Sequence, residues 1–182
     1  MKSLKKFITA PLLFVGIIVS AYLLNIITPF DLNQYGIRPR SISGLFGIPL
    51  VVFLHGDFSH LFNNSVPLLI LGMLLRSYGR NVFASVTIGL ILLSGLLTWV
   101  FSPSDLLVGA SGLVFSYFSY LITKAVRDKT ALTILIASAA IFTYGGLLFS
   151  LGHFQAGVSW TGHFCGFAGG IILAVFDSKK LR

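Results

Sequence analysis

The chain has 182 residues, of which 55% are hydrophobic and only 10% are charged, and its mean hydropathy is +0.92. A soluble globular domain carries about 25% charged residues, so this composition excludes one and indicates a membrane protein. The net charge of +8 comes from Lys and Arg residues in short clusters between apolar runs, not on one face of a domain. We therefore expect the basic residues to reflect membrane topology, and we expect no nucleic-acid partner.

Six apolar segments are long enough, or nearly so, to cross a hydrocarbon layer, which takes about 20 residues. They are approximately residues 7–28, 61–75, 82–101, 106–122, 132–149 and 158–176. The basic N-terminus is typical of a signal peptide, but the apolar run behind it exceeds the about 7–15 residues of a signal core and no A-x-A site closes it. The sequence predicts an all-α bundle of six transmembrane helices, forming a single membrane domain over residues 1–182.

A long connection, residues 29–59, joins the first two segments and contains the run "SGLFGIPLVVFL". This run is apolar, but it is too short and too interrupted by Gly and Pro to span a membrane. We expect an interfacial, partly embedded loop that covers one flank of the bundle.

The positions of the basic residues predict the orientation of the helices. Most of them fall at one end of the predicted bundle: Lys2, Lys5, Lys6, Arg76, Arg80, Lys124, Arg127, Lys129, Lys179, Lys180 and Arg182. Only Arg38 and Arg40 fall at the other end, so the positive-inside rule places both termini in the cytoplasm. The second, fourth and sixth segments then begin at the outer face.

Four polar residues share a depth in this arrangement. His60 and Asn64 lie in the first turns of the second segment, while Ser111 and His163 lie about a turn into the fourth and sixth. At 1.5 Å of rise per residue, all four fall close to the outer surface. Polar groups inside a membrane are costly and tend to mark function.

Ser111 stands in the stretch "GASG" and has two interpretations. Taken alone, it is more simply a helix-contact serine in a stripe with Gly112, Ser116 and Ser119. His163 favours chemistry, because a serine becomes nucleophilic when a base lies within about 3 Å of its hydroxyl.

The surroundings of His163 allow such an approach. The glycines at 162, 166 and 170 recur every fourth residue in "TGHFCGFAGG" and form a small-residue face for a neighbouring helix. The fourth segment, with Gly109 and Gly112 around its serine, is the natural partner. The single cysteine, Cys165, is interpreted as a small core residue.

Acyl transfer also needs hydrogen-bond donors for the developing oxyanion. His60 and Asn64 stand four residues apart on one helix face and both carry N–H donors. The alternative is that they cap or hydrogen-bond the 29–59 loop, and this structural role is the one we prefer for His55. The common depth with Ser111 favours the catalytic role for His60 and Asn64.

Other kinds of site fit the residues less well. No Asp or Glu falls within a predicted helix, so a Ser-His dyad is simpler than a Ser-His-Asp triad. The chain has no Glu and no H-E-x-x-H motif, so we predict no metal and no cofactor. His153 is interpreted as a loop histidine.

Taken together, the stretches "HGDFSHLFNN", "GASG" and "GHFCGFAGG" resemble the motifs of rhomboid intramembrane serine proteases of the minimal six-helix bacterial type. The resemblance spans nearly the whole chain. H-x4-H-x3-N falls on His55, His60 and Asn64, G-x-S-G falls on Gly109, Ser111 and Gly112, and H-x2-G-x3-G falls on His163, Gly166 and Gly170.

The resemblance implies a Ser111–His163 dyad, with His60, Asn64 and the Ser111 backbone amide as oxyanion donors. It implies a multi-pass protein of a prokaryotic plasma membrane, with a water-accessible cavity open to the outer or periplasmic side. Its substrates would be transmembrane segments of other proteins, unwound near small or helix-breaking residues and cut close to the outer face.

The chain departs from the usual family pattern at three places. Phe115 stands where many relatives have a Tyr that packs on the catalytic His. The first loop has Arg38 and Arg40 but lacks the Trp of a common Trp-Arg pair, and Arg76 replaces a frequent Glu. These departures concern loop anchoring and helix-end contacts, not the dyad.

Two rival functions remain at this point. A catalytically inactive relative would bind transmembrane segments without cleaving them, and the intact Ser111 and His163 argue against it. A small transporter would line a path through the bilayer with polar residues. The inner halves of the second, fourth and sixth segments are nearly all apolar or small, so no path is evident.

Overall fold

The computed structural model describes residues 2–103, 105–150 and 159–177, and the side chains of residues 8–103, 105–149 and 159–177. His153, Lys179, Lys180 and Arg182 lie outside the described residues, as does residue 158 of the last predicted segment. The elements in chain order are α1 (Lys2–Ile27), η1 (Leu32–Tyr35), α2 (Ile42–Leu45), α3 (Gly47–Leu50), η2 (Val51–Phe53), α4 (Phe58–Arg76), α5 (Arg80–Phe101), α6 (Ser111–Asp128), α7 (Ala131–Tyr144), α8 (Leu147–Ser150) and α9 (Trp160–Phe176).

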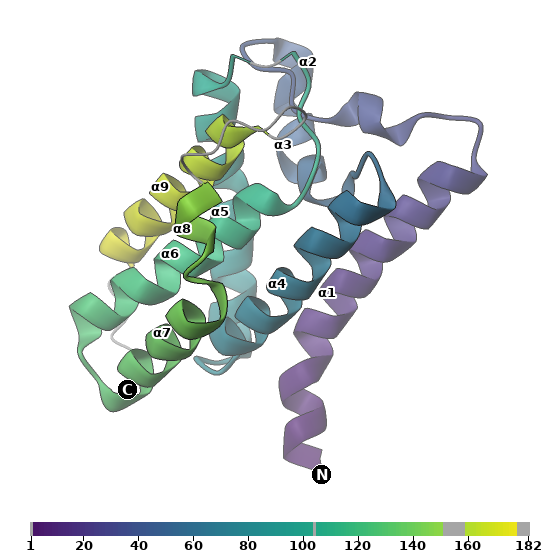
Figure 1. Ribbon diagram of the computed structural model, residues 1–182. Coiled ribbons are helices and arrows are strands. Elements are labelled where there is room, and N and C mark those ends of the chain that lie inside the picture. The colour runs from purple at the N-terminus through teal and green to yellow at the C-terminus, as the bar shows by residue number, and fades with distance from the viewer. Residues whose placement is uncertain (1, 104, 151–158, 178–182) are drawn as a thin grey trace.

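The long helices form a bundle in which neighbours along the chain run in opposite directions. Helices α4, α6 and α9 begin toward the upper end and run downward, whereas α1, α5 and α7 run upward (Figure 1). Three helical stretches are long and apolar enough to cross a membrane: Ile8–Ile27, Phe58–Arg76 and Arg80–Phe101. Helices α7 and α9 are shorter and apolar. The regular structure of the described residues is thus helical, as predicted, with several helices of membrane length.

Helix α6 lies at the centre of the bundle and contacts α4, α5, α7 and α9. Every residue from Leu113 to Leu121 is buried, as expected for a helix surrounded by others. Its serines join it to α9: the Ser116 hydroxyl donates to the Gly166 carbonyl at 2.8 Å, and the Ser119 hydroxyl donates to the Phe167 carbonyl at 2.7 Å. Such interhelical hydrogen bonds satisfy polar groups that lipid cannot.

The α6–α9 contact is close enough to require glycine. A Cβ atom on Gly166 would lie 2.2 Å from the Gly112 carbonyl oxygen, and one on Gly170 would lie 2.3 Å from the Ser116 carbonyl oxygen. Both obstacles are backbone atoms, so no side-chain rotation relieves them. The predicted small-residue face of α9 therefore does face α6.

We expect Gly166→Ala to lower the stability of the protein by about 1–3 kcal/mol, the usual cost of overpacking, because it forces α6 and α9 apart. Thermal unfolding in detergent measures the effect. Gly169→Ala is the matched control on the same helix, since its Cβ would meet nothing closer than 3.4 Å. Equal melting temperatures for the two variants would contradict the close contact.

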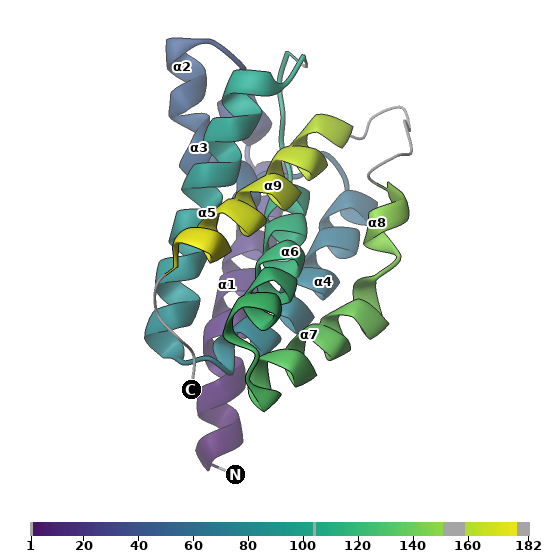
Figure 2. The same ribbon diagram turned by 90° about the vertical axis from the view of Figure 1, so that its left-hand side faces the viewer.

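Residues 29–59 form an ordered connection instead of one irregular loop. Its short helices α2 and α3 lie beside the upper half of α5 and cover that flank (Figure 2). Arg40 donates from its guanidinium to the Ser102 carbonyl at 2.6 Å, and the Trp99 indole of α5 donates to the Ser41 carbonyl at 2.9 Å. A tryptophan from α5 thus takes part in anchoring a loop that contains none itself.

Several predicted helix ends were wrong. The fourth segment begins at Ser111 instead of residue 106 and continues to Asp128 instead of residue 122. The fifth does not run unbroken to residue 149, because α7 ends at Tyr144 and α8 follows after Gly145 and Gly146. Consecutive glycines are poor helix formers, which explains the break.

The lower end of α6 carries a buried ion cluster around Lys124, which lies two residues beyond the predicted end of this helix. The Lys124 side chain is fully buried and lies 3.0 Å from the Asp128 carboxylate and 3.8 Å from that of Asp177. The Tyr120 hydroxyl donates to Asp177 at 2.6 Å, and Arg127 donates to the Asp177 carbonyl at 3.1 Å. These bonds tie the end of α9 to α6.

Candidate active site

The backbone before α6 is held in a non-helical conformation by the 29–59 connection. Leu107 and Ile37 exchange two backbone hydrogen bonds of 2.9 Å, and the Gly109 amide donates to the Val51 carbonyl at 3.0 Å. Gly109 has a φ of +118°, which a residue with a side chain rarely adopts. Ser111 is consequently the first residue of α6, not a residue one turn inside it. The first amides of a helix have no acceptor within the helix, and that of Ser111 is among them.

His60 and Asn64 of α4 reach this turn. A Cβ on Gly109 would lie 2.5 Å from His60 Nε2 and 3.6 Å from Asn64 Nδ2, so no side chain fits there. Asp57 fixes the start of α4 by accepting the His60 backbone amide at 2.8 Å. The structure thus brings both predicted oxyanion donors to the backbone two residues before Ser111.

His55 holds the same turn from the side of the connection. Its side chain is 1% exposed, and its Nε2 accepts the Ala110 amide at 3.4 Å. Its ring also meets that of His60 edge-on, with centroids 5.0 Å apart. We expected His55 to bond the loop; its carbonyl does accept from Asn33, but its imidazole bonds the residue before Ser111. No local residue pattern predicts this contact.

Burial, with a contribution from the charge of His60, lowers the pKa of His55 to about 4, while the Phe53 carbonyl and Asp57 act in the opposite direction. An accepting Nε2 also requires a neutral ring. The folded-state pKa is below the unfolded value of about 6.5. The contribution of His55 to the free energy of unfolding is therefore fully present above about pH 6.5 and is lost as the pH falls toward 4. The loss attributable to His55 is on the order of 3 kcal/mol.

Unfolding of the protein in detergent, followed between pH 7 and pH 4, tests this dependence. His55→Gln keeps a hydrogen-bond acceptor but does not titrate, so it is expected to show a clearly shallower pH dependence than the wild type. Identical slopes for the two proteins would assign the effect to other groups.

Ser111 and His163 are each next to a glycine where α6 and α9 also come near one another, beyond the tighter Gly166–Gly112 contact. A Cβ on Gly112 would lie 3.4 Å from the Gly162 carbonyl oxygen, so the residue after Ser111 and the residue before His163 are in contact. His163 is 8% exposed and lies one turn into α9, as predicted. Its ring stacks on Phe115, with centroids 4.4 Å apart and planes inclined by 24°. Residue 115 thus packs an aromatic ring on the histidine, but as phenylalanine it supplies no hydroxyl.

Several polar groups at this site lack partners within the part of the chain that the structure describes. Asn64 Nδ2 and His163 Nδ1 are buried without a hydrogen bond, and the Ser111 hydroxyl forms none, with His163 or with any other described group. Ser116 and Ser119, by contrast, bond α9 carbonyls. Catalytic hydrogen bonds are often long before substrate binds. The hydroxyl of Ser111 therefore differs from those of the helix-contact serines.

No metal site is formed by the described residues. They contain no group of three or more His, Cys, Asp or Glu side chains placed to hold an ion. His55 and His60 lie together, but Nε2 of His55 already accepts the Ala110 amide. The chemistry available here is that of a hydroxyl, imidazoles and amides.

Comparison with known proteins agrees with this geometry. A family model described as "Rhomboid domain" matches residues 42–180. An uncharacterized protein of Mycobacterium tuberculosis (strain ATCC 25618 / H37Rv) is 33% identical over 185 residues, which cover 96% of this chain and 76% of that protein. One of Mycobacterium leprae (strain TN) is 33% identical over 182 residues, which cover 94% of this chain and 71% of that protein. The chain belongs to the rhomboid family.

Proposed function

We propose that this protein is an intramembrane serine endopeptidase that cleaves transmembrane segments near the outer face through a Ser111–His163 dyad. The observation that carries the proposal is the set of unpartnered groups at the start of α4, α6 and α9. Asn64 Nδ2 and His163 Nδ1 are buried, and a buried polar group without a partner costs about 1–3 kcal/mol, so keeping both indicates a role other than stability.

In the proposed reaction, His163 takes the Ser111 hydroxyl proton as Oγ attacks the peptide carbonyl carbon. The oxyanion accepts hydrogen bonds from Asn64, His60 and the Ser111 amide. The tetrahedral intermediate collapses to an acyl-enzyme, and His163 gives its proton to the leaving amine. Water, deprotonated by His163, then attacks the ester and releases Ser111 and the new carboxyl terminus.

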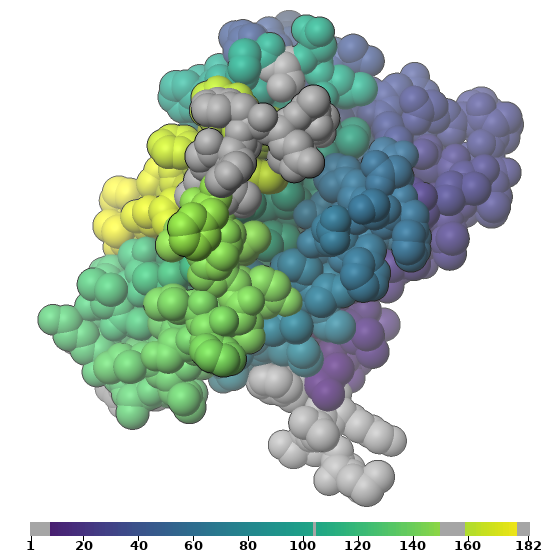
Figure 3. Space-filling model, viewed as in Figure 1, coloured from purple at the N-terminus to yellow at the C-terminus, as the bar shows by residue number. Residues whose placement is uncertain are grey.

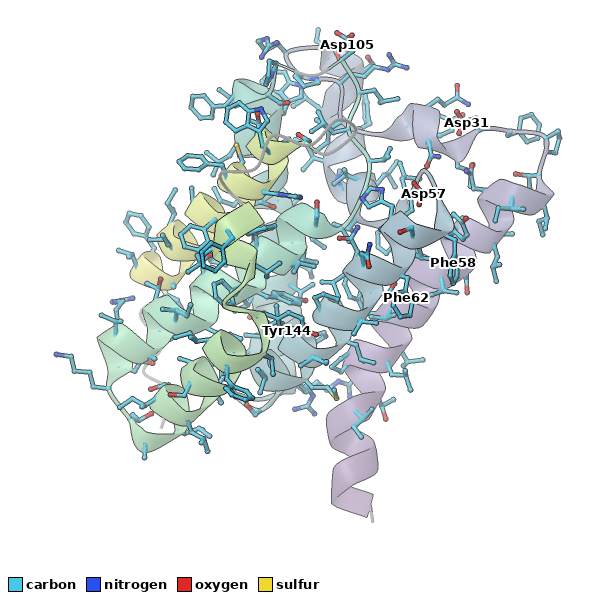
Figure 4. The ribbon with its side chains drawn as sticks, in the orientation of Figure 1. Asp31, Asp57, Phe58, Phe62, Asp105 and Tyr144 are labelled. Carbon is cyan, nitrogen blue, oxygen red and sulfur yellow. The ribbon has the colours of Figure 1, made fainter. Side chains whose placement is uncertain are left out.

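The surroundings of His163 support a dyad instead of a triad. Asp31, Asp57 and Asp105 lie at the upper end of the molecule, outside the helix interiors (Figure 4). No described carboxylate hydrogen-bonds His163, whose Nδ1 is without a partner. Stacking on Phe115 takes the orienting role that an aspartate has in a triad.

The orientation that we propose has six membrane spans in one domain over residues 1–182, in a prokaryotic plasma membrane, with both termini in the cytoplasm. The charge distribution supports it. Arg76 and Arg80 flank the lower turn between α4 and α5, and Lys129 follows α6 at the same end. The upper end, where the site lies, carries three of the acidic residues (Figure 4). The active site then opens to the outer, periplasmic side.

The proposed substrates are transmembrane segments of other proteins, entering laterally from the bilayer. Phe58 and Phe62 are exposed on the first two turns of α4, the turns that carry His60 and Asn64, so apolar surface lies next to the site (Figure 4). Unwinding a helix in lipid leaves backbone groups unsatisfied. Segments that are already weak helices are therefore expected to be cleaved best.

Reconstitution of the protein in liposomes tests the proposal. A transmembrane substrate with a glycine-rich, helix-weak outer half is expected to be cut within that half, as mass spectrometry of the products will show. A matched substrate with leucines at those positions is expected to be cut far more slowly. Binding of both substrates with cleavage of neither would favour an inactive protein that binds transmembrane segments.

A further inference from the structure

A cavity lies at the lower end of the molecule, far from Ser111. It has a volume of about 340 Å³ and is lined by Thr9, Ala10, Leu13, Arg76 and Arg80. Figure 3 shows the first coloured residues of α1 emerging beside the end of α4 at the lower edge of the molecule. Arg76 is 12 residues beyond Asn64 on α4, which is about 18 Å along the helix. The cavity is therefore separate from the candidate active site.

The charge of this cavity is suited to an anion. Two arginine residues line it, and α1, α4 and α5 contain no Asp or Glu. Arginine presents a planar set of donors that matches the oxygens of a phosphate. Thr9 also belongs to this lining.

The position and walls of the cavity add a hydrophobic requirement. Arg76 is the last residue of one membrane-length helix and Arg80 is the first residue of the next, so both lie where hydrocarbon gives way to headgroups. Ala10 and Leu13 of α1 supply apolar walls. A ligand that fits has a phosphate joined to hydrocarbon.

We propose that this cavity binds the phosphate of an anionic phospholipid, with Arg76 and Arg80 as the anion-binding side chains. The lipid would fill the space between the start of α1 and the turn from α4 to α5. Its glycerol and first acyl carbons would contact Ala10 and Leu13. A membrane surface rich in anionic lipid attracts basic residues at such a depth.

Native mass spectrometry of the full chain in detergent tests this site by titration with phosphatidylglycerol or with phosphatidylcholine of the same acyl chains. Phosphatidylglycerol is expected to bind more tightly. The double variant Arg76→Gln/Arg80→Gln is expected to bind it about 30-fold more weakly, the effect of about two surface charges. Arg38→Gln/Lys129→Gln removes the same charge away from the cavity and is expected to match the wild type.

Ala10→Leu fills the cavity while it keeps both arginines, and it decides the question if the double arginine variant fails to fold. It is expected to weaken phosphatidylglycerol binding as well. Equal binding of the two lipids by the wild type, or unchanged binding by Ala10→Leu and the double arginine variant, would overturn the proposal. Displacement of the lipid by excess inorganic phosphate would also overturn it, in favour of a site for free phosphate.

Discussion

Ser111→Ala is expected to lower the rate of cleavage of a reconstituted transmembrane substrate by at least about 10³-fold while the protein remains folded. Without Oγ no acyl-enzyme forms, and only the donors and the binding site remain. Because the Ser111 hydroxyl has no hydrogen-bond partner among the described residues, its removal leaves no group unsatisfied. Melting temperature and substrate binding are therefore expected to stay at the wild-type values.

His163→Ala is expected to reduce cleavage to a similar extent, and the double variant is expected to be no slower than either single variant. Residues that act together in one step show such non-additivity. His163→Ala also removes the ring that stacks on Phe115, so a modest loss of stability accompanies it.

Ser116→Ala is the matched control, because Ser116 lies on the same helix but donates to the Gly166 carbonyl. It is expected to lose about 0.5–1.5 kcal/mol of stability and to keep its cleavage rate. A fluorophosphonate probe should label the wild type at Ser111 and leave Ser111→Ala unlabelled. Persistent cleavage by Ser111→Ala, or an equal loss in Ser116→Ala, would contradict the dyad.

Hydropathy predicted each of the long helices, because a membrane span needs a continuous apolar run whatever its neighbours are. It did not predict where α6 begins. The residues before Ser111 are as apolar as those after it, yet Leu107 pairs with Ile37 and Gly109 bonds Val51. These partners lie more than 50 residues away in the chain, so no pattern of neighbouring residues predicts the pairing.

Motif spacing and hydropathy predicted which helices carry the candidate site residues, and the structure places them on those helices, with Ser111 at the start of its helix instead of one turn inside. Their surroundings did not follow from the sequence. The contact of His55 with Ala110 and the hydrogen bond of Trp99 to the loop join distant segments, and the stacking of Phe115 on His163 was indicated only by the family resemblance. The sequence also does not distinguish Ser111 from Ser116, because both belong to one small-residue stripe. They differ in hydrogen bonding, which only the structure shows.

Asn64→Ala is expected to lower kcat by about 10²–10³-fold, the usual effect of removing one oxyanion donor. The donor acts on charge that develops only as the peptide carbonyl is attacked, so KM is expected to change little. His60→Ala is expected to give a smaller loss, because the His60 ring is partly exposed and the Asn64 side chain is buried.

The stability of the same variant separates a catalytic from a structural role. Asn64 is 5% exposed and its Nδ2 has no partner among the described residues, so the amide carries an uncompensated desolvation cost. Removing it is expected to leave the melting temperature unchanged or to raise it. Ser65→Ala, at the adjacent buried residue, is the control and is expected to keep its kcat. A fall in stability that matches the fall in activity would make Asn64 a structural residue. Lost turnover in an equally stable protein would instead identify Asn64 as a hydrogen-bond donor to the transition state.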